Sequence, residues 1–233
     1  MAPSVSNTYV EQALRRTKYL NQWLLFISGY RVDPFLKELC SDPKIKSRRS
    51  PAINRGYLAR LLALEVTFEK FLSIPGKFKQ VLSLGAGFDS MYFRLKNCDI
   101  IREEINYFEV DYPESVKRKD ARIFKSSYLR SFFQKRNVIK NDIFVYNDGR
   151  FTLVGCDMIQ VNELLGKFQL SGFDPNAETL ILTECSTTYI HADQCENLLN
   201  MLTNYLKKFA YISYEQIRKE VLIFFFYLEI NLS

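Results

Sequence analysis

The chain has 233 residues, of which 47% are hydrophobic and 25% are charged, so it is long enough to bury one large core. Its net charge of +6 is too small to identify a nucleic acid or an acidic protein as a partner. Five cysteines without Cys-x-x-Cys spacing argue against a disulfide framework and against a zinc site. We therefore expect no metal and a reducing, cytoplasmic location.

No membrane segment is expected from the hydropathy pattern. The longest apolar run, residues 221–228, is too short to cross a bilayer. The residues that follow Met1 show neither the basic region nor the apolar region of a signal peptide.

Residues 1–75 carry no strand pattern, and we expect them to form an N-terminal helical cap. Within this segment, residues 57–72 show apolar spacings of three and four, which predict one amphipathic helix. The side chains on its apolar face are Tyr57, Leu61, Leu64, Phe68, Phe71 and Leu72.

Residues 76–217 alternate between two kinds of periodicity. Short apolar runs bounded by polar or glycine-containing turns predict five strands, at residues 80–84, 105–111, 151–157, 179–184 and 209–214. Helical patterns lie between them; the clearest covers residues 191–207, and Pro113 suits the first turn of another helix. This alternation predicts an α/β fold with a mostly parallel, Rossmann-like sheet and flanking helices.

A glycine turn follows the first predicted strand. Gly85 and Gly87 lie directly after that strand, and Asp111 ends the next strand 24 residues after Gly87. Glycines let a ligand approach the backbone closely, and an acid at this distance can accept hydrogen bonds from both ribose hydroxyls. The turn lacks the third glycine of a dinucleotide site, which favours S-adenosylmethionine over NAD. A purely structural turn is the alternative.

Two more strand ends carry acids. Asp157 follows the third strand and Glu184 ends the fourth, so both are expected near Asp111 at the carboxyl edge of the sheet. Clustered carboxylates require donors such as hydroxyl, amine or ammonium groups. Arg55 and Arg60 are the candidate cations for a ligand carboxylate, and the nearby basic residues of the same stretch are interpreted as solvated surface.

Five ordered motifs resemble the leucine carboxyl methyltransferase family across residues 8–217. They are residues 54–60 (NRGYLAR), 82–90 (LSLGAGFDS), 108–113 (FEVDYP), 184–189 (ECSTTY) and 214–216 (YEQ). The family has two branches, the methyltransferase of the C-terminal leucine of protein phosphatase 2A and the tRNA wybutosine-synthesizing methyltransferase. Residues 81–95 and 49–51, together with Ala52, look closer to the tRNA branch, whereas Cys185 points to the other one.

The resemblance implies a class I methyltransferase fold and S-adenosyl-L-methionine as the cofactor. It implies that Arg60 binds the methionine carboxylate, that Glu184 binds the methionine ammonium group, and that Asp111 holds the ribose. The remaining implied cofactor residues are Gly85, Gly87, Asp157 and Met158. Arg16 or Lys18 matches a basic element that lies near the cofactor in the family.

The resemblance also implies a substrate carboxylate, oriented by Tyr189 with Arg55 as a candidate partner. The favoured substrate is tRNA carrying the wybutosine precursor, and the catalytic subunit of protein phosphatase 2A is the alternative. A carboxylate is ionised at neutral pH, so no general base is needed. His191, the single histidine, is accordingly interpreted as a capping or surface residue at a helix start.

Residues 218–233 match nothing in the family, and we expect the last strands of the family's sheet to be missing. The strand at residues 209–214 would then lie at an exposed edge unless the tail covers it. The tail could pair as a strand or lie as an amphipathic helix, and a membrane anchor is a third interpretation. Because of this departure, an inactive cofactor-binding remnant is the second functional hypothesis.

Overall fold

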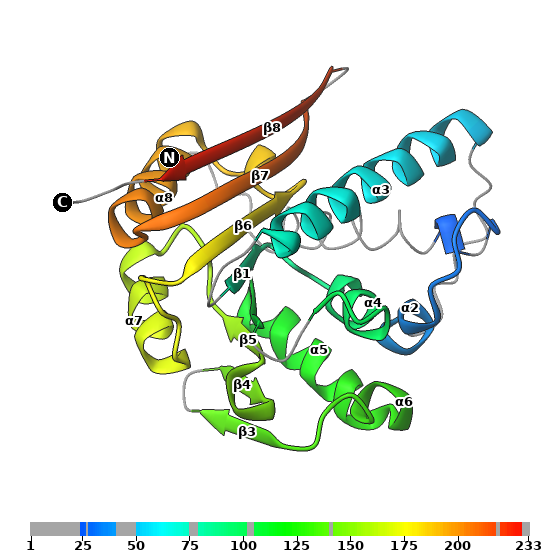
Figure 1. Cartoon of the computed structure of the whole chain (residues 1–233), viewed down its shortest axis with the longest axis horizontal. Coiled ribbons are helices and arrows are strands. Elements are labelled where there is room, and N and C mark those ends of the chain that lie inside the picture. The colour runs from blue at the N-terminus through cyan, green and yellow to red at the C-terminus, as the bar shows by residue number, and fades with distance from the viewer. Residues whose placement is uncertain are drawn as a thin grey trace, which may run out of the picture.

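A single mixed sheet with helices on both faces organises the computed structural model (Figure 1). The structure describes residues 24–26, 28–40, 50–74, 79–101, 105–139, 142–217 and 220–229, of which residues 148, 216, 217 and 220–229 are described by their backbone alone. Arg16 and Lys18 lie outside these residues, so their predicted role stays a prediction.

Eight strands of the described chain form the sheet, in the order β3-β4-β5-β2-β1-β6-β7-β8. Their bounds are β1 (Lys79–Leu84), β2 (Ile105–Asp111), β3 (Arg136–Ile139), β4 (Ile143–Tyr146), β5 (Phe151–Gly155), β6 (Glu178–Glu184), β7 (Lys208–Ile217) and β8 (Glu220–Glu229). The five central strands, β5-β2-β1-β6-β7, are parallel. Antiparallel pairs complete both sides of the sheet, with β3 and β4 beside β5 and β8 beside β7.

The helices pack on the two faces of the sheet. They are α2 (Pro34–Leu39), α3 (Pro51–Ser73), α4 (Met91–Asn97), α5 (Pro113–Lys125), α6 (Ser127–Arg130), α7 (Val161–Ser171) and α8 (Ala192–Tyr205), with the 3-10 turns η1 (Asn147–Gly149) and η2 (Thr187–Tyr189). Figure 1 shows α7 and α8 on one side and α3, α4 and α5 on the other. Pro113 occupies the first turn of α5, and His191 is the N-cap residue of α8, as predicted.

Two hydrophobic clusters fill the space between sheet and helices. Val81 of β1 packs in the cluster shared with α2 to α5, and its neighbour Leu82 packs in the cluster shared with α7 and α8. Successive strand residues point to opposite faces, so a strand covered on both sides is apolar throughout. Phe68 of α3 belongs to the first cluster, so the described part of the expected cap packs directly on the sheet.

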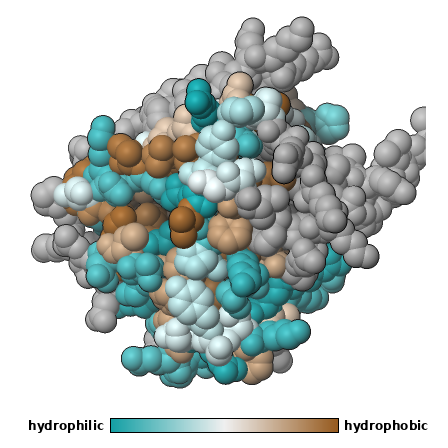
Figure 2. All heavy atoms as spheres, turned by 90° about the vertical axis from the view of Figure 1, so that its right-hand side faces the viewer, coloured by the Kyte–Doolittle hydropathy of each residue, from teal (hydrophilic) through white to brown (hydrophobic). Residues whose placement is uncertain are grey.

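The surface seen from the side of α2 and the start of α3 is mixed in polarity. Hydrophobic side chains gather toward one side of this face in Figure 2, and hydrophilic residues alternate with residues of intermediate hydropathy over its remaining described area. On α3, the exposed apolar residues include Ile53, Leu62 and Val66.

All five predicted strands are present, although the third ends at Gly155 and leaves Asp157 in the following turn. The prediction missed β3 and β4, because each has only four residues and β3 is largely exposed. Strands of this length give too few positions for an alternation of polar and apolar residues to be recognised.

Of the three interpretations of the tail, pairing as a strand is the one that the structure shows for residues 220–229. Residues 220–229 form β8, which pairs with β7 antiparallel over ten positions, from Lys208↔Glu229 to Ile217↔Glu220. The run at 221–228 is rich in aromatic and branched residues, which favour strands. Among the described residues, no helix is both long and apolar enough to cross a membrane.

Candidate functional site

The order of the parallel strands fixes where a ligand can enter. Reading outward from β1, the chain continues to β2 and β5 on one side and to β6 and β7 on the other. In sheets with this order, ligands bind in the crevice at the carboxyl ends of the strands where the direction changes. Here that point lies between the ends of β1 and β6, which the chain marks with Gly85 and Glu184.

The glycine turn after β1 has a backbone that favours glycine at two positions. Gly85 and Gly87 have φ values of 70° and 56°, in the left-handed region. The Gly85 amide donates to the Val110 carbonyl at 2.8 Å, which ties the turn to β2. A Cβ atom at Gly85 would lie 2.6 Å from the Cβ of Ser186, so a side chain cannot fit there without displacing that residue.

Asp111 is fixed beside this turn. Its Oδ2 accepts a hydrogen bond from the Gly87 amide at 2.7 Å, and its Oδ1 accepts one from the Tyr112 amide at 2.8 Å. A carboxylate offers about four acceptor positions, so two remain for a ligand's hydroxyl groups. The structure therefore brings Gly87 and Asp111 together, and the ribose contact stays a prediction.

Asp157 and Met158 lie half-buried in the turn after β5. Burial raises the pKa of Asp157 above its ordinary value; the Ile159 amide, which donates to it at 3.2 Å, opposes this shift, and the charges of Glu163 and Asp111 add to it. The Cys156 amide donates to the Asp111 carbonyl at 2.8 Å, so the turn after β5 starts beside the end of β2. The predicted roles of Asp111 and Asp157 in binding ribose and adenine are compatible with this placement and remain untested.

A buried ion pair joins α3 to the end of β6. The Arg60 Nε lies 2.6 Å from Glu184 Oε1, and the two side chains are 2% and 0% exposed. The Arg60 Nη1 also donates to the Cys185 Sγ at 3.3 Å. Two residues predicted to bind opposite charges of one ligand thus lie in direct contact, at the predicted edge of the sheet.

Aromatic rings enclose the Arg60 guanidinium. Its carbon lies 5.3 Å from the ring centroid of Tyr57 and 5.1 Å from that of Tyr214, within the range of cation–π attraction. Burial by itself would lower the pKa of Arg60, but Glu184 and smaller contributions from its other neighbours raise the pKa above its ordinary value. The positive charge is therefore permanent, as a carboxylate-binding residue requires.

Tyr189 ends η2 and is 42% exposed, and Arg55 is exposed on α3. Burial raises the pKa of Tyr189 above its ordinary value. The neighbouring Cys185, Glu215 and Tyr57 raise this pKa further, whereas Arg60 lowers it. The Tyr189 hydroxyl is therefore protonated at neutral pH and can donate a hydrogen bond. The described contacts do not bring Arg55 to Tyr189, so their partnership remains a prediction.

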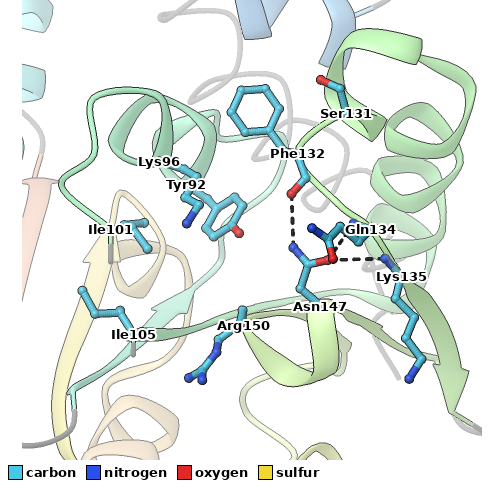
Figure 3. A pocket seen from close by; sticks show the side chains of 10 residues that line it. All are labelled: Tyr92, Lys96, Ile101, Ile105, Ser131, Phe132, Gln134, Lys135, Asn147 and Arg150. Atoms are coloured by element: carbon cyan, nitrogen blue, oxygen red, sulfur yellow. Dashed lines mark hydrogen bonds between the residues drawn. The ribbon is translucent and has the colours of Figure 1, made fainter. Parts of the chain in front are cut away.

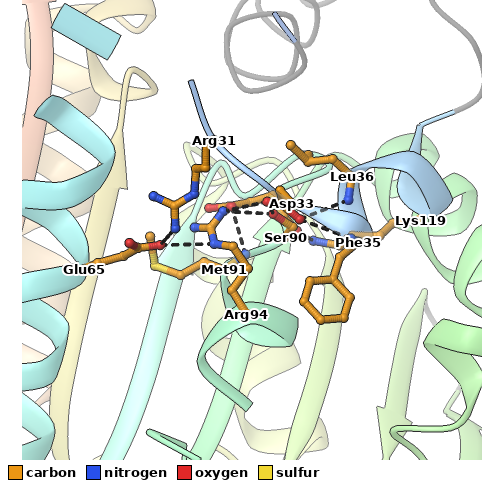
Figure 4. Close-up of polar contacts among 10 residues, drawn as sticks. Arg31, Asp33, Phe35, Leu36, Glu65, Ser90, Met91, Arg94 and Lys119 are labelled. Atoms are coloured by element: carbon orange, nitrogen blue, oxygen red, sulfur yellow. Dashed lines mark hydrogen bonds and ion pairs between the residues drawn. The ribbon is translucent and has the colours of Figure 1, made fainter. Parts of the chain in front are cut away.

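A second polar network braces the helix that follows the glycine turn (Figure 4). Asp33 Oδ2 accepts hydrogen bonds from Ser90 Oγ at 2.6 Å and from Arg94 Nη1 at 3.0 Å. Arg94 Nε lies 3.1 Å from Glu65 of α3, which also pairs with Arg31. The sequence prediction missed this network, because the buried Arg94 stands within an apolar helix pattern that gives no sign of its partners.

A cavity of about 430 Å³ lies elsewhere, beside the starts of β2 and β5 (Figure 3). Its lining includes the cationic residues Lys96, Lys135 and Arg150, and none of the predicted site residues lines it. The Asn147 carboxamide holds the adjacent loop by accepting from the Gln134 amide at 2.8 Å and donating to the Phe132 carbonyl at 3.1 Å. In the part of the chain that the structure describes, no group of three His, Cys, Asp or Glu residues could hold a metal.

Comparison with known proteins places these features in a family. Residues 15–203 match the family model described as leucine carboxyl methyltransferase. The chain belongs to the leucine carboxyl methyltransferase family. This family membership confirms the resemblance that the five motifs indicated.

Relatives of this chain carry one of two names. Leucine carboxyl methyltransferase 1 of Rattus norvegicus is 30% identical over 82% of this chain and 58% of the relative. The tRNA wybutosine-synthesizing protein 4 of Homo sapiens is 30% identical over 94% of this chain and 31% of the relative. The chain thus spans little more than half of the first relative and under a third of the second.

Solved structures support the fold of this family member. A Thermobifida fusca protein described as a candidate methyltransferase aligns with a TM-score of 0.52 and 12% identity, over 72% of this chain and 56% of that protein. The α/β class with a mostly parallel sheet, predicted from the sequence, is therefore confirmed.

Proposed function

We propose that this chain transfers a methyl group from S-adenosylmethionine to a carboxylate oxygen of its substrate. The observation that carries the proposal is the buried Arg60–Glu184 pair beside the glycine turn. An isolated charge is costly to bury, and a neighbouring pair of opposite charges suits the zwitterionic amino-acid end of this cofactor. Membership of the leucine carboxyl methyltransferase family supports the same chemistry.

The chain's own residues would hold the cofactor at three points. Arg60 would bind its carboxylate and Glu184 its ammonium group, while Asp111, oriented by the Gly87 amide, would accept the ribose hydroxyls. Asp157 and Met158, in the turn after β5, would contact the adenine. Gly85 and Gly87 would let the cofactor lie close to the backbone.

The reaction needs positioning more than proton transfer. When bound, the cofactor supplies an electrophilic methyl group on a sulfonium; the new C–O bond forms as the C–S bond breaks, and the electron pair of the broken bond stays on sulfur. The accepting carboxylate is already ionised, so no side chain has to remove a proton. Alignment of the reacting groups can contribute about 7–11 kcal/mol in favourable cases.

Tyr189 is the proposed positioning residue for the substrate, with Arg55 as its candidate partner. The Tyr189 hydroxyl is held protonated near Arg60 and can donate to the substrate carboxylate. Arg55 is exposed on α3 and could approach a bound substrate from solvent. We assign His191 no part in the reaction, because it is the N-cap residue of α8, where its amide donates to the Gln194 side chain.

For the substrate we favour tRNA carrying the wybutosine precursor. Residues 81–95, which include the glycine turn and the start of α4, resemble the tRNA branch, and one relative is named a tRNA wybutosine-synthesizing protein. The catalytic subunit of protein phosphatase 2A is the second candidate, supported by the relatives named leucine carboxyl methyltransferase 1.

Methyl transfer from labelled cofactor tests the proposal. The purified chain is incubated with methyl-labelled S-adenosylmethionine and either the tRNA or the phosphatase subunit, and base-labile label distinguishes a methyl ester from other products. We expect label in the tRNA, and a ten- to hundredfold lower kcat/KM for Tyr189→Phe, on the scale of about 1.5–3 kcal/mol for a hydrogen bond to a charged group. Transfer to the phosphatase subunit would reverse the choice of substrate. Cofactor binding with transfer to neither would instead support an inactive remnant.

A further inference from the structure

Glu215, on β7, accepts five side-chain hydrogen bonds, none of which is part of the pairing between strands. Its side chain is buried at 6% exposure. Oε1 accepts from the amides of Ser186 at 3.3 Å and Thr187 at 3.1 Å and from the Thr187 hydroxyl at 2.6 Å. Oε2 accepts from the Thr188 amide at 3.1 Å and from the Thr188 hydroxyl.

All five donors belong to one short segment, residues 186–188, which joins β6 to Tyr189. A carboxylate is an acceptor-only group with about four lone-pair positions, so this segment fills its capacity. Buried, charge-assisted hydrogen bonds of this kind are stronger than those between neutral groups. Glu215 therefore fixes the backbone and the side chains of the segment at once.

The same segment lies against the glycine turn and leads directly to Tyr189. It begins after Cys185, which has a left-handed φ of 49°, an unusual backbone for a residue other than glycine. Its first residue, Ser186, fills the space where a Gly85 side chain would lie. Within the described residues, the buried Ser186 Oγ has no hydrogen-bond partner, so the segment presents an unused hydroxyl beside the glycine turn.

We propose that Glu215 is a positioning residue for methyl transfer, holding residues 186–188 so that Ser186 and Tyr189 face the substrate beside Arg60. The inference rests on the proposed function, because it takes Tyr189 as the residue that orients the substrate carboxylate. In this proposal Glu215 acts through residues 186–188, to which its carboxylate is hydrogen-bonded. Its negative charge also contributes to raising the pKa of Tyr189, which agrees with the two residues being close.

The isosteric variant Glu215→Gln replaces one of the two acceptor oxygens of the carboxylate with an NH₂ group. Its NH₂ group would face hydroxyl and amide donors where a carboxylate oxygen now accepts, so at least one side of the segment loses its anchor. Glu196→Gln is the matched control, because Glu196 is exposed on α8 and the same charge is removed there. Thr188→Val is a milder second variant that deletes one donor and keeps the carboxylate.

The kinetic test separates positioning from folding. We expect Glu215→Gln to bind S-adenosylmethionine within about twofold of the unmodified chain and to lower the Tm by only a few degrees, because hydrogen bonds to the buried carboxylate are lost. Over the same change kcat/KM for the substrate should fall about a hundredfold, the scale of a small misplacement of reacting groups. Thr188→Val should lower kcat/KM less, and Glu196→Gln should not change it. Unchanged kcat/KM in Glu215→Gln would overturn the proposal, as would a loss of Tm and cofactor affinity in proportion to the loss of activity.

Hydrogen exchange tests, without any turnover, whether Glu215 holds residues 186–188. The amides of residues 186–188 should exchange faster in Glu215→Gln, and the amides of α8 should exchange as before. If the unmodified chain transfers no methyl group, the proposed function fails, and the exchange rates still decide whether Glu215 holds the segment. Equal exchange at residues 186–188 in both proteins would show that it does not.

Discussion

At the scale of single residues, the contact between Arg60 and Glu184 makes each side chain dependent on the other. Both are almost fully buried, and their charges lie 2.6 Å apart. Removing one partner of such a pair leaves an uncompensated charge in the interior, which is far more costly than removing an exposed charge.

Arg60→Ala should therefore lower the free energy of unfolding by about 3–5 kcal/mol and abolish cofactor binding. Denaturant unfolding measures the first effect and calorimetry the second. Arg118→Ala is the control, because Arg118 is exposed on α5, and its effect should be within about 0.5 kcal/mol.

The double variant Arg60→Ala/Glu184→Ala tests whether the two residues act as a pair. It should be less destabilised than the sum of the two single variants, because no buried charge is left alone. Strict additivity would mean that the two side chains act independently in solution.

The positions of two acids at strand ends could be predicted from the sequence, but their contacts could not. Asp111 and Glu184 were found because each ends an apolar strand, a local signal. The Arg60–Glu184 contact depends on how α3 packs against β6. The hydrogen bonds between Glu215 and residues 186–188 depend on the pairing of β6 with β7. No spacing along the chain encodes such a tertiary register.

At the scale of secondary structure elements, β8 decides how the sheet ends. It forms ten backbone pairs with β7 and covers an edge that would otherwise expose a row of unpaired amides and carbonyls. Its apolar run is visible in the sequence, but the run resembles nothing in the family, so a strand, an amphipathic helix and a membrane anchor all stay open from the sequence alone.

Deleting residues 218–233 should lower the Tm by several degrees and promote aggregation. In chains of this size, a loss of about 1 kcal/mol in the free energy of unfolding lowers the Tm by roughly 2–4 °C. We expect the loss of the ten-position pairing between β7 and β8 to cost more than about 1 kcal/mol. Thermal unfolding by circular dichroism is the measurement, with deletion of residues 230–233 as the control. An unchanged Tm with better solubility would show that these residues do not belong to the sheet in solution.

At the scale of the whole molecule, the site and the core share the same strands. The strands β1, β2 and β6, which end at Leu84, Asp111 and Glu184, carry both hydrophobic clusters in their middle sections. A ligand that binds at these strand ends binds the folded chain alone, so it should stabilise the entire domain.

S-adenosylhomocysteine at about 100 times its Kd should add about 2.7 kcal/mol to the free energy of unfolding, or roughly 5–10 °C in Tm. Asp111→Ala should lose most of this shift at the same concentration, because hydrogen bonds to a charged group contribute about 1.5–3 kcal/mol. Differential scanning fluorimetry is the measurement, with NAD as the control ligand. A shift of equal size in Asp111→Ala would contradict the ribose assignment.

The close approach of Gly85 to Ser186 affects how a mutational scan of this chain should be interpreted. The two residues come from different loops, Gly85 from the proposed cofactor side and Ser186 from the proposed substrate side, and they leave no room for a Cβ atom between them. Gly85→Ala would therefore push the substrate-side segment as well as change the cofactor turn. Loss of activity in a Gly85 variant therefore does not by itself identify a ligand contact. The same substitution can act through the glycine turn or through the displaced Ser186.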